Sequence, residues 1–387
     1  MIQAVALLQD AYRELNARKM FWITLAISVL VVGAFAAFGV SEGGITILWW
    51  EIENDLINAD LVEPSLFYKW AFAMIGVPIW LTWAATILAL ISTASIFPDF
   101  VASGSIELLL SKPIGRLRLY FGKYLTGLLF VGLQVLVFTL ACFLVIALRG
   151  GSVEWGLFLA VPIVLVFYSY LFCVMAVVGQ LTRSTIAALL LTILFWLMIF
   201  ALNQTEAILL FQRERYAAEI ERLEERTSAM EAAAQRTIER WREDPPQSPV
   251  DPPDGAEPGP APEPTPEQAN PLLGRTRAQL AEAEENFRTW RAWHRYFFLA
   301  KTVLPKTQET IALLGQGLLS AEDMDRFQPE GEAAAADEAV QFGDPRVARR
   351  VQDVLRERSR LWIIGTSLLF EGVVLAFGAW RFSRRDF

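Results

Sequence analysis

Six long apolar stretches constrain this chain more than any other feature of its sequence. A transmembrane helix needs about 20 consecutive, mostly apolar residues to cross a hydrocarbon core of about 30 Å. The stretches that meet this requirement are Phe21–Val40, Ala71–Ile96, Tyr124–Leu148, Gly156–Val178, Ile186–Leu202 and Leu361–Trp380. Because backbone groups in lipid must find hydrogen-bond partners within the protein, each stretch is predicted to be a helix. The sequence therefore predicts an all-α polytopic membrane protein with six transmembrane helices.

The distribution of Lys and Arg predicts how these spans are oriented, because cytoplasmic loops carry an excess of both residues. They gather before the first span, between the second and third spans, and after the last, as Arg13, Arg18, Lys19, Lys112, Arg116, Arg118, Lys123, Arg381, Arg384 and Arg385. The loop between the first two spans is acidic. We therefore expect a protein of the cell (inner) membrane with both termini in the cytoplasm.

One segment disagrees with this orientation. Residues 346–360 hold six Arg and directly precede the last span, on the side that the predicted topology makes external. Long translocated loops largely escape the charge rule. The first two loops therefore decide the predicted topology, in which residues 21–204 hold spans one to five and 361–387 hold the sixth span with a basic tail.

Residues 1–20 have the pattern of an amphipathic helix. Val5, Leu8, Tyr12 and Leu15 recur at helical spacing, and the charged residues lie largely elsewhere. Next to a span, such a helix usually lies flat in the membrane interface. The alternative is an ordinary solvated lead-in to the first span.

A large polar insertion, residues 205–360, separates the fifth and sixth spans. Its two helical segments have apolar positions in steps of four and three, the spacing of a coiled-coil seam. The seam includes Leu223, Thr227, Met230 and Ala234 in the first segment, and Leu273, Thr276, Leu280, Ala283 and His294 in the second. The Pro-rich residues 245–271 join them as an extended linker. This pattern predicts an extracytoplasmic coiled-coil hairpin, which is either a docking arm for an extracytoplasmic partner or a spacer.

The sequence shows no constellation of residues that indicates a catalytic site. His294 is the only histidine and falls on the predicted apolar seam, which favours a packed histidine over a catalytic or metal-binding one. Residues 115–124 end in Gly-Lys-Tyr, but their spacing is wrong for a phosphate-binding loop and Tyr124 replaces its Ser or Thr. The net charge of −8 argues against nucleic-acid binding. We expect no enzymatic activity, no cofactor and no metal site.

Two polar residues lie at membrane depth. Glu371 is at the centre of the sixth span and Gln134 is within the third. A carboxylate inside a membrane is costly and usually faces the bundle interior, a cavity or a partner. Glu371 is either a residue of the translocation path or gate, or a protonated or paired group that joins helices. Gln134 is interpreted as a hydrogen-bonding contact between helices.

The cytoplasmic loop 97–120 is the most informative stretch. It contains a short apolar helix, Ile106–Leu110, that ends before Pro113 and is followed by cations. Leucines exposed on a cytoplasmic loop favour a groove on another protein.

This loop resembles the permease subunits of ABC transporters of the type-2 exporter family. The likeness rests on the run Ser103–Arg116 followed by Gly122 and Lys123, on the six-span plan with its interfacial helix, and on the closing residues 381–387. It covers the spans and their cytoplasmic edges but not the insertion.

The resemblance implies a permease, and in particular an exporter, that works with a separate cytoplasmic ATPase subunit and a second permease chain, identical or not. The loop would couple to the ATPase through Gly104, Ile106, Glu107, Leu109, Leu110, Lys112, Pro113, Arg116 and Lys123. Membrane lipid would surround the spans. The alternative from another class is a multi-pass membrane scaffold whose coiled-coil arm docks a partner protein. The cargo is not predicted.

Overall fold

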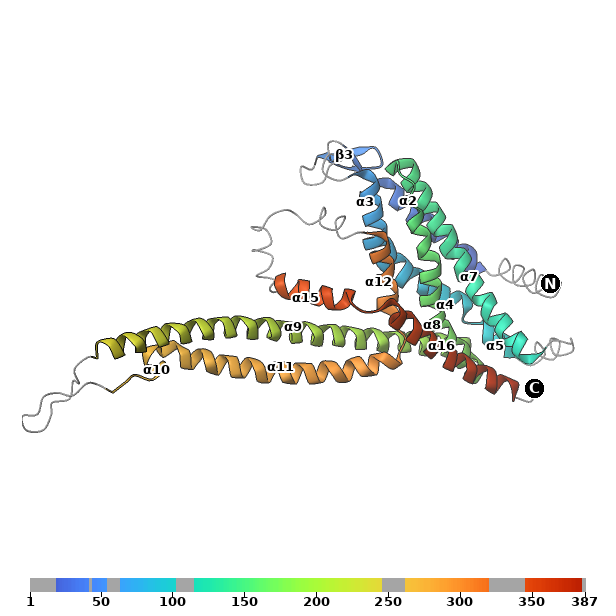
Figure 1. Cartoon of the computed structure of the whole chain (residues 1–387). Coiled ribbons are helices and arrows are strands. Elements are labelled where there is room, and N and C mark those ends of the chain that lie inside the picture. The colour runs from blue at the N-terminus through green and yellow to red at the C-terminus, as the bar shows by residue number, and fades with distance from the viewer. Residues whose placement is uncertain are drawn as a thin grey trace, which may run out of the picture. The chain divides into compact units, whose positions relative to one another are not determined.

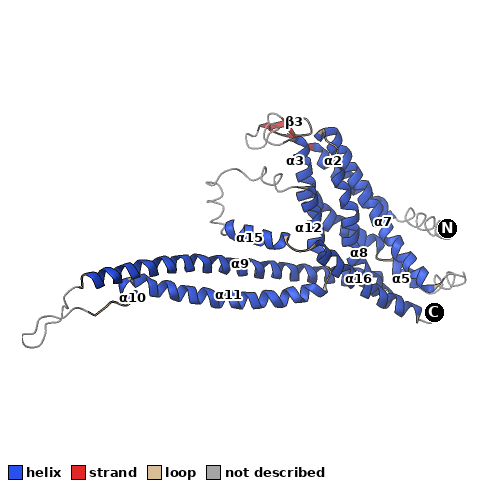
Figure 2. Cartoon of the chain, viewed as in Figure 1, coloured by secondary structure: helices blue, strands red, loops and turns tan. Residues whose placement is uncertain are grey.

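The computed structural model describes residues 19–41, 44–53, 63–101, 115–245, 262–319 and 345–384. Most of the predicted N-terminal helix 1–20 and of the linker 245–271 lie outside these ranges. Within them, six helices are long and apolar enough to cross a membrane, which confirms the predicted number of spans. Nearly all described residues are helical (Figure 2).

Several spans are built from consecutive helical elements. The first is α2 (Lys19–Ala37), and the second runs through α3 (Pro64–Ala71), η1 (Phe72–Ala85), α4 (Thr86–Thr93) and α5 (Ile96–Val101). The others are α7 (Arg116–Val145) with η2 (Ile146–Gly150), η3 (Trp155–Leu159) with α8 (Ala160–Thr182), α9 (Thr185–Glu243) and α16 (Arg360–Ser383).

The described residues divide into two compact units. The first takes in residues up to Asn203, between Ala300 and Gly331, and from Arg358 onward. The second takes in residues between Gln204 and Leu299 and between Glu332 and Glu357. The first unit therefore contains the spans, and its sequence is interrupted by the second.

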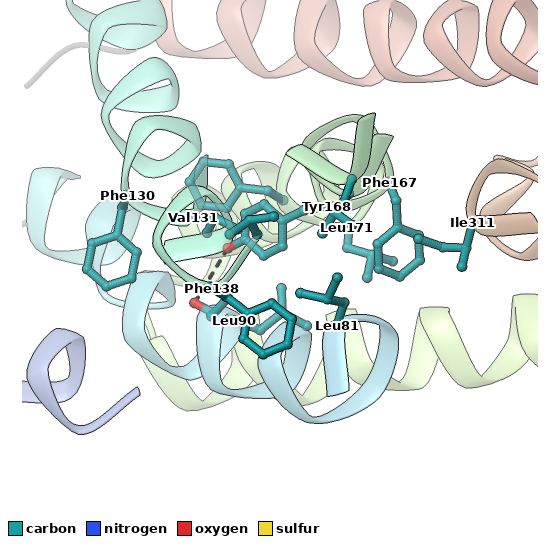
Figure 3. Close-up of a cluster of buried hydrophobic side chains, with 14 of the residues drawn as sticks. Leu81, Leu90, Phe130, Val131, Phe138, Phe167, Tyr168, Leu171 and Ile311 are labelled. Atoms are coloured by element: carbon teal, nitrogen blue, oxygen red, sulfur yellow. Dashed lines mark hydrogen bonds between the residues drawn. The ribbon is translucent and has the colours of Figure 1, made fainter. Parts of the chain in front are cut away.

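The core of the first unit lies between the second, third and fourth spans. Leu81 of η1, Leu90 of α4, Phe130 and Phe138 of α7 and Tyr168 of α8 are all buried there (Figure 3). Other large apolar side chains of the spans, such as Leu30, Leu133 and Leu194, are exposed, as the outer surface of a bundle in lipid requires.

Element η1 is a π-helix, a rare form with i→i+5 hydrogen bonds that often marks functional sites. Pro78 lies inside it and cannot donate a backbone hydrogen bond. The hydroxyl of Thr82 donates to the carbonyl oxygen of Val77, five residues earlier, at 2.9 Å. The wider helix thus forms where proline removes the ordinary pairing.

A three-stranded antiparallel sheet follows α2 where the sequence predicts the end of the first span and a loop. Its strands are β1 (Phe38–Ser41), β2 (Gly44–Ile47) and β3 (Trp50–Glu53), in the order β1-β2-β3. The predicted first span continued to Val40, but α2 ends at Ala37. The reason is that the hydroxyl of Tyr68 donates to the carbonyl oxygen of Phe38 at 2.7 Å, and β1 pairs with β2 instead of extending the helix.

The first unit also contains α12 (Thr307–Leu318), which comes from the polar insertion between the fifth and sixth spans. This helix packs against α8, η1, η3 and α16. Its buried residues are Thr307, Thr310, Ile311, Leu314 and Leu318. Part of the polar insertion is therefore a component of the bundle.

The second unit is built on the later part of α9, with α10 (Pro266–Ala269), α11 (Pro271–Val303) and α15 (Pro345–Arg356). Helices α9 and α11 lie side by side (Figure 1). They run antiparallel, because Glu231 pairs with Arg277 at one end and Glu206 with His294 at the other. The seam positions Leu223, Thr227, Ala234, Leu273, Thr276 and Ala283 are buried. A coiled-coil geometry stays a prediction.

Candidate functional site

The carboxylate of Glu371 lies inside the bundle, where three spans meet. Its side chain comes from the middle of α16 and is 9% exposed. The Tyr124 hydroxyl of α7 donates to Oε1 at 2.8 Å, and the Ser169 hydroxyl of α8 donates to Oε2 at 2.7 Å. Tyr124 also contacts the carbonyl oxygen of Ser169 at 3.1 Å. We call Tyr124, Ser169 and Glu371 the carboxylate cluster.

A close approach of α7 and α8 makes this cluster possible. A Cβ atom added to Gly127 of α7 would lie 2.2 Å from Cζ of Phe172 on α8, so only glycine fits at that crossing. Phe172 in turn stacks on Tyr124, with ring centroids 5.1 Å apart. The crossing therefore fixes the position of the Tyr124 hydroxyl that meets Glu371.

Gln134 is buried on α7, beside a small cavity of about 20 Å³ between α2, η1, α7 and α8. Trp80 of η1 and the hydroxyl residues Thr24 and Ser28 of α2 also line this cavity. Within the described residues, neither Nε1 of Trp80 nor Nε2 of Gln134 has a hydrogen-bond partner. Two buried donors thus face a space that holds about one water molecule.

The structure describes only the two ends of the predicted coupling loop. Gly104, Ile106, Glu107, Leu109, Leu110, Lys112 and Pro113 lie outside the described residues. Arg116 begins α7, and its Nη1 donates to the carbonyl oxygen of Ser383 on α16 at 3.0 Å. Lys123 lies two turns further along α7. The far end of the loop is therefore tied to the end of α16.

The near end of the loop is held by packing. The Phe100 ring of α5 stacks on Phe382 of α16, with centroids 5.2 Å apart. Pro98 lies so close to Gly179 of α8 that an added Cβ there would be 3.0 Å from its Cδ. Both ends of the loop thus contact the spans that carry Glu371 and Ser169.

A buried group of charged residues holds α12 in the bundle. Oε1 of Glu309 accepts a hydrogen bond from Nη1 of Arg358 at 3.0 Å and also pairs with Nζ of Lys301. Lys306 precedes α12, and its Nζ donates to the carbonyl oxygen of Thr302 at 2.9 Å. Loss of hydration on burial, offset in part by Glu309, lowers the pKa of Lys306 from its usual 10.5 to about 8.

The second unit has a groove of about 830 Å³ between α9, α11 and α15, lined by Arg215, Arg222, Glu219 and Glu282 among others. His294 of α11 is buried against α9. Its Nε2 lies 3.1 Å from Oε1 of Glu206, and its Nδ1 lies 3.3 Å from Nη1 of Arg213. The histidine is thus a packed residue with a polar partner on each ring nitrogen.

The sequence indicates Glu371 as a candidate, but not the two hydroxyl groups that bind it. Tyr124 and Ser169 are themselves polar residues inside predicted spans, and that property could have indicated them as partners of a buried carboxylate. Among the described residues, no group of three or more His, Cys, Asp or Glu is placed to hold a metal ion. The carboxylate cluster can exchange hydrogen bonds as helices move, and the small cavity can accept a polar atom.

Comparison with known protein families finds a match for the first part of the chain. A family model described as "ABC-2 family transporter protein" matches residues 4–233, which is more than half of the chain. The match extends from before α2 into α9. No curated protein and no solved structure matches the chain.

Proposed function

The chain belongs to the ABC-2 family of transporter proteins, and we propose that it is the permease of an exporter driven by a separate cytoplasmic ATPase. The observation that carries the proposal is the family match over residues 4–233, which includes the first five spans and the whole loop 97–120. Two permease chains, identical or different, would enclose the path of the cargo.

We further propose that residues 104–116 form the helix that couples ATP hydrolysis to the spans. Ile106, Leu109 and Leu110 would fill a cleft of the ATPase, and Glu107 and Arg116 would make polar contacts at its rim. The anchoring of both loop ends supports this assignment, because Arg116 bonds to α16 and Phe100 stacks on the same helix. A movement of the loop by the ATPase would then displace α16 directly.

The experiment that tests this proposal compares Leu109, in the loop that precedes α7, with Leu148 of η2, which follows α7. Leu109→Glu and Leu148→Glu each replace a leucine by a charged residue, the first in the loop and the second at the far end of the span, where Leu148 is 83% exposed. We expect Leu109→Glu to abolish co-purification of the ATPase and Leu148→Glu to preserve it. Retained binding by Leu109→Glu would refute the coupling assignment.

We also propose that Glu371 takes part in the transport cycle. The carboxylate cluster joins α16 to α7 and α8 through hydroxyl groups alone among the described contacts. Movement of α16 would therefore open the cluster without separating an ion pair. This supports a gating role over a fixed structural one.

The proposed topology places both termini in the cytoplasm and the second unit outside. It rests on the cations at Arg116, Arg118 and Lys123 and on the acidic loop after the first span. A protease site placed in the linker 245–271 tests it. Cleavage from outside spheroplasts whose inner membrane is intact is the expected result, and cleavage only after that membrane is opened would reverse the topology.

A further inference from the structure

The sheet after α2 separates apolar and polar side chains onto two faces. Successive side chains in a strand point to opposite faces, and directly paired residues share a face. Phe38 pairs with Ile47, and Ile47 pairs with Trp50, so all three lie on one face. The apolar face consists of Phe38, Val40, Ile47, Trp50 and Ile52, and the opposite face carries Gly39, Ser41, Thr46 and Glu51.

The polar face is turned toward the bundle. A Cβ atom added to Gly39 would lie 2.9 Å from the hydroxyl oxygen of Tyr68 and 3.4 Å from Nη2 of Arg149. Thr46 lies beside Gly39 on the neighbouring strand, and the Ser41 hydroxyl donates to the Glu51 carboxylate. The polar groups of the sheet are thus used within the first unit.

The apolar face and the turn beside it are left open. Trp50 is 66% exposed and Ile52 is 52% exposed. In the turn between β2 and β3, Trp49 is 75% exposed and its ring lies 5.5 Å from that of Trp50. Large apolar residues gathered on one surface normally mark a binding surface.

The depth of this surface in the membrane follows from its place in the chain, directly after the span α2. Strand β1 begins at Phe38, one residue after α2 ends, and the backbone N–H of Leu48 donates to the carbonyl oxygen of Ala37 at 2.6 Å. The sheet therefore lies at the end of a membrane span. That level is the membrane interface, where tryptophan is enriched.

We propose that the apolar face of this sheet, together with Trp49, lies against the lipid bilayer and inserts into its interfacial layer. Lipid is the partner, because the exposed surface continues directly from the end of a span and consists of aliphatic and tryptophan side chains. The sheet stops at the interface, because its edge strands β1 and β3 carry backbone groups that need water or lipid headgroups as partners. By binding the interfacial layer, the sheet holds the end of α2 at a fixed depth in the membrane.

The test is a cysteine scan along β3 in the full-length chain. Trp50, Glu51 and Ile52 are replaced one at a time by Cys and labelled with an environment-sensitive fluorophore. The two native cysteines, Cys142 and Cys173, are buried, and the unsubstituted chain measures their background labelling. Each labelled chain is reconstituted in vesicles whose lipids carry a nitroxide close to the headgroup, and folding is checked by size-exclusion chromatography.

The expected result alternates with a period of two residues. Labels at 50 and 52 are quenched several-fold more by the nitroxide lipid than the label at 51, which is quenched by iodide in the water. Equal quenching by iodide at all three positions would overturn the proposal. Labels at 50 and 52 that neither quencher reaches, with energy transfer between chains, would overturn it in favour of a contact between two copies.

Discussion

The crossing of α7 and α8 gives the sharpest test of the structure, through the substitution Gly127→Ala. The added methyl group would lie 2.2 Å from Cζ and 2.5 Å from Cε1 of Phe172. The ring cannot swing away easily, because its centroid lies 5.1 Å from that of Tyr124 and 5.6 Å from that of Tyr168. The two helices must therefore separate or the aromatic stack must break.

The magnitude follows from two opposing effects. Overpacking a well-packed site costs about 1–3 kcal/mol. Alanine in place of glycine within a helix stabilises by roughly 0.5–1 kcal/mol. The control is Gly122→Ala on the same helix, where an added Cβ meets no atom within 4 Å. Because the helix-propensity effect is common to both variants, we expect Gly127→Ala to be less stable than Gly122→Ala by about 1–3 kcal/mol.

The assay is reversible unfolding in mixed detergent micelles, followed by tryptophan fluorescence. Replacing Phe172 by Leu in the Gly127→Ala background should restore part of the lost stability, since the smaller side chain makes room for the methyl group. If Gly127→Ala and Gly122→Ala are equally stable, the close approach of α7 and α8 is wrong, and with it the geometry of the carboxylate cluster.

Three further predictions concern the buried charged groups. Glu371→Gln should impair transport while expression and assembly are preserved, measured as ATP-dependent cargo movement in vesicles; unchanged transport would remove Glu371 from the mechanism. Glu309→Gln removes the negative charge that the buried cations Lys301 and Arg358 share, and it should lower the free energy of unfolding by about 3 kcal/mol. The control is Glu231→Gln, which removes an exposed ion pair and should leave the stability nearly unchanged. Lys306 has a pKa of about 8 in the folded chain, below its usual 10.5. Between about pH 8 and pH 10.5 the unfolded chain therefore binds more protons than the folded chain, and the free energy of unfolding should rise with pH over that range. Lys306→Met should abolish that rise in a pH series of unfolding measurements.

The spans could be predicted because apolar length is a local property of the chain. Each predicted stretch lies within an observed span apart from the end of the first, where Phe38–Val40 belong to β1. The sheet was missed because its strands are only four residues long, and an apolar stretch that ends in a strand has the same composition as one that ends in a helix. Only pairing with β2 decides between them.

The partners of buried polar groups could not be predicted, because they are distant in the sequence. Glu309 lies in the polar insertion between the fifth and sixth spans, yet it is largely buried against Arg358, 49 residues away. Glu371 was recognisable as a carboxylate inside a span. Which hydroxyl groups meet it depends on the crossing of α7 and α8, which a single glycine, Gly127, permits.

The long separation within the carboxylate cluster has a consequence for biosynthesis. Tyr124 and Glu371 are 247 residues apart, and Ser169 and Glu371 are 202 residues apart. At a translation rate of roughly 5–20 residues per second, Glu371 emerges about 12–50 s after Tyr124. Until then α7 and α8 present two hydroxyl groups to a vacant position, and the whole second unit must be made before α16 can fill it. A ribosome that stalls in the insertion therefore leaves a bundle in which Tyr124 and Ser169 still lack their carboxylate partner.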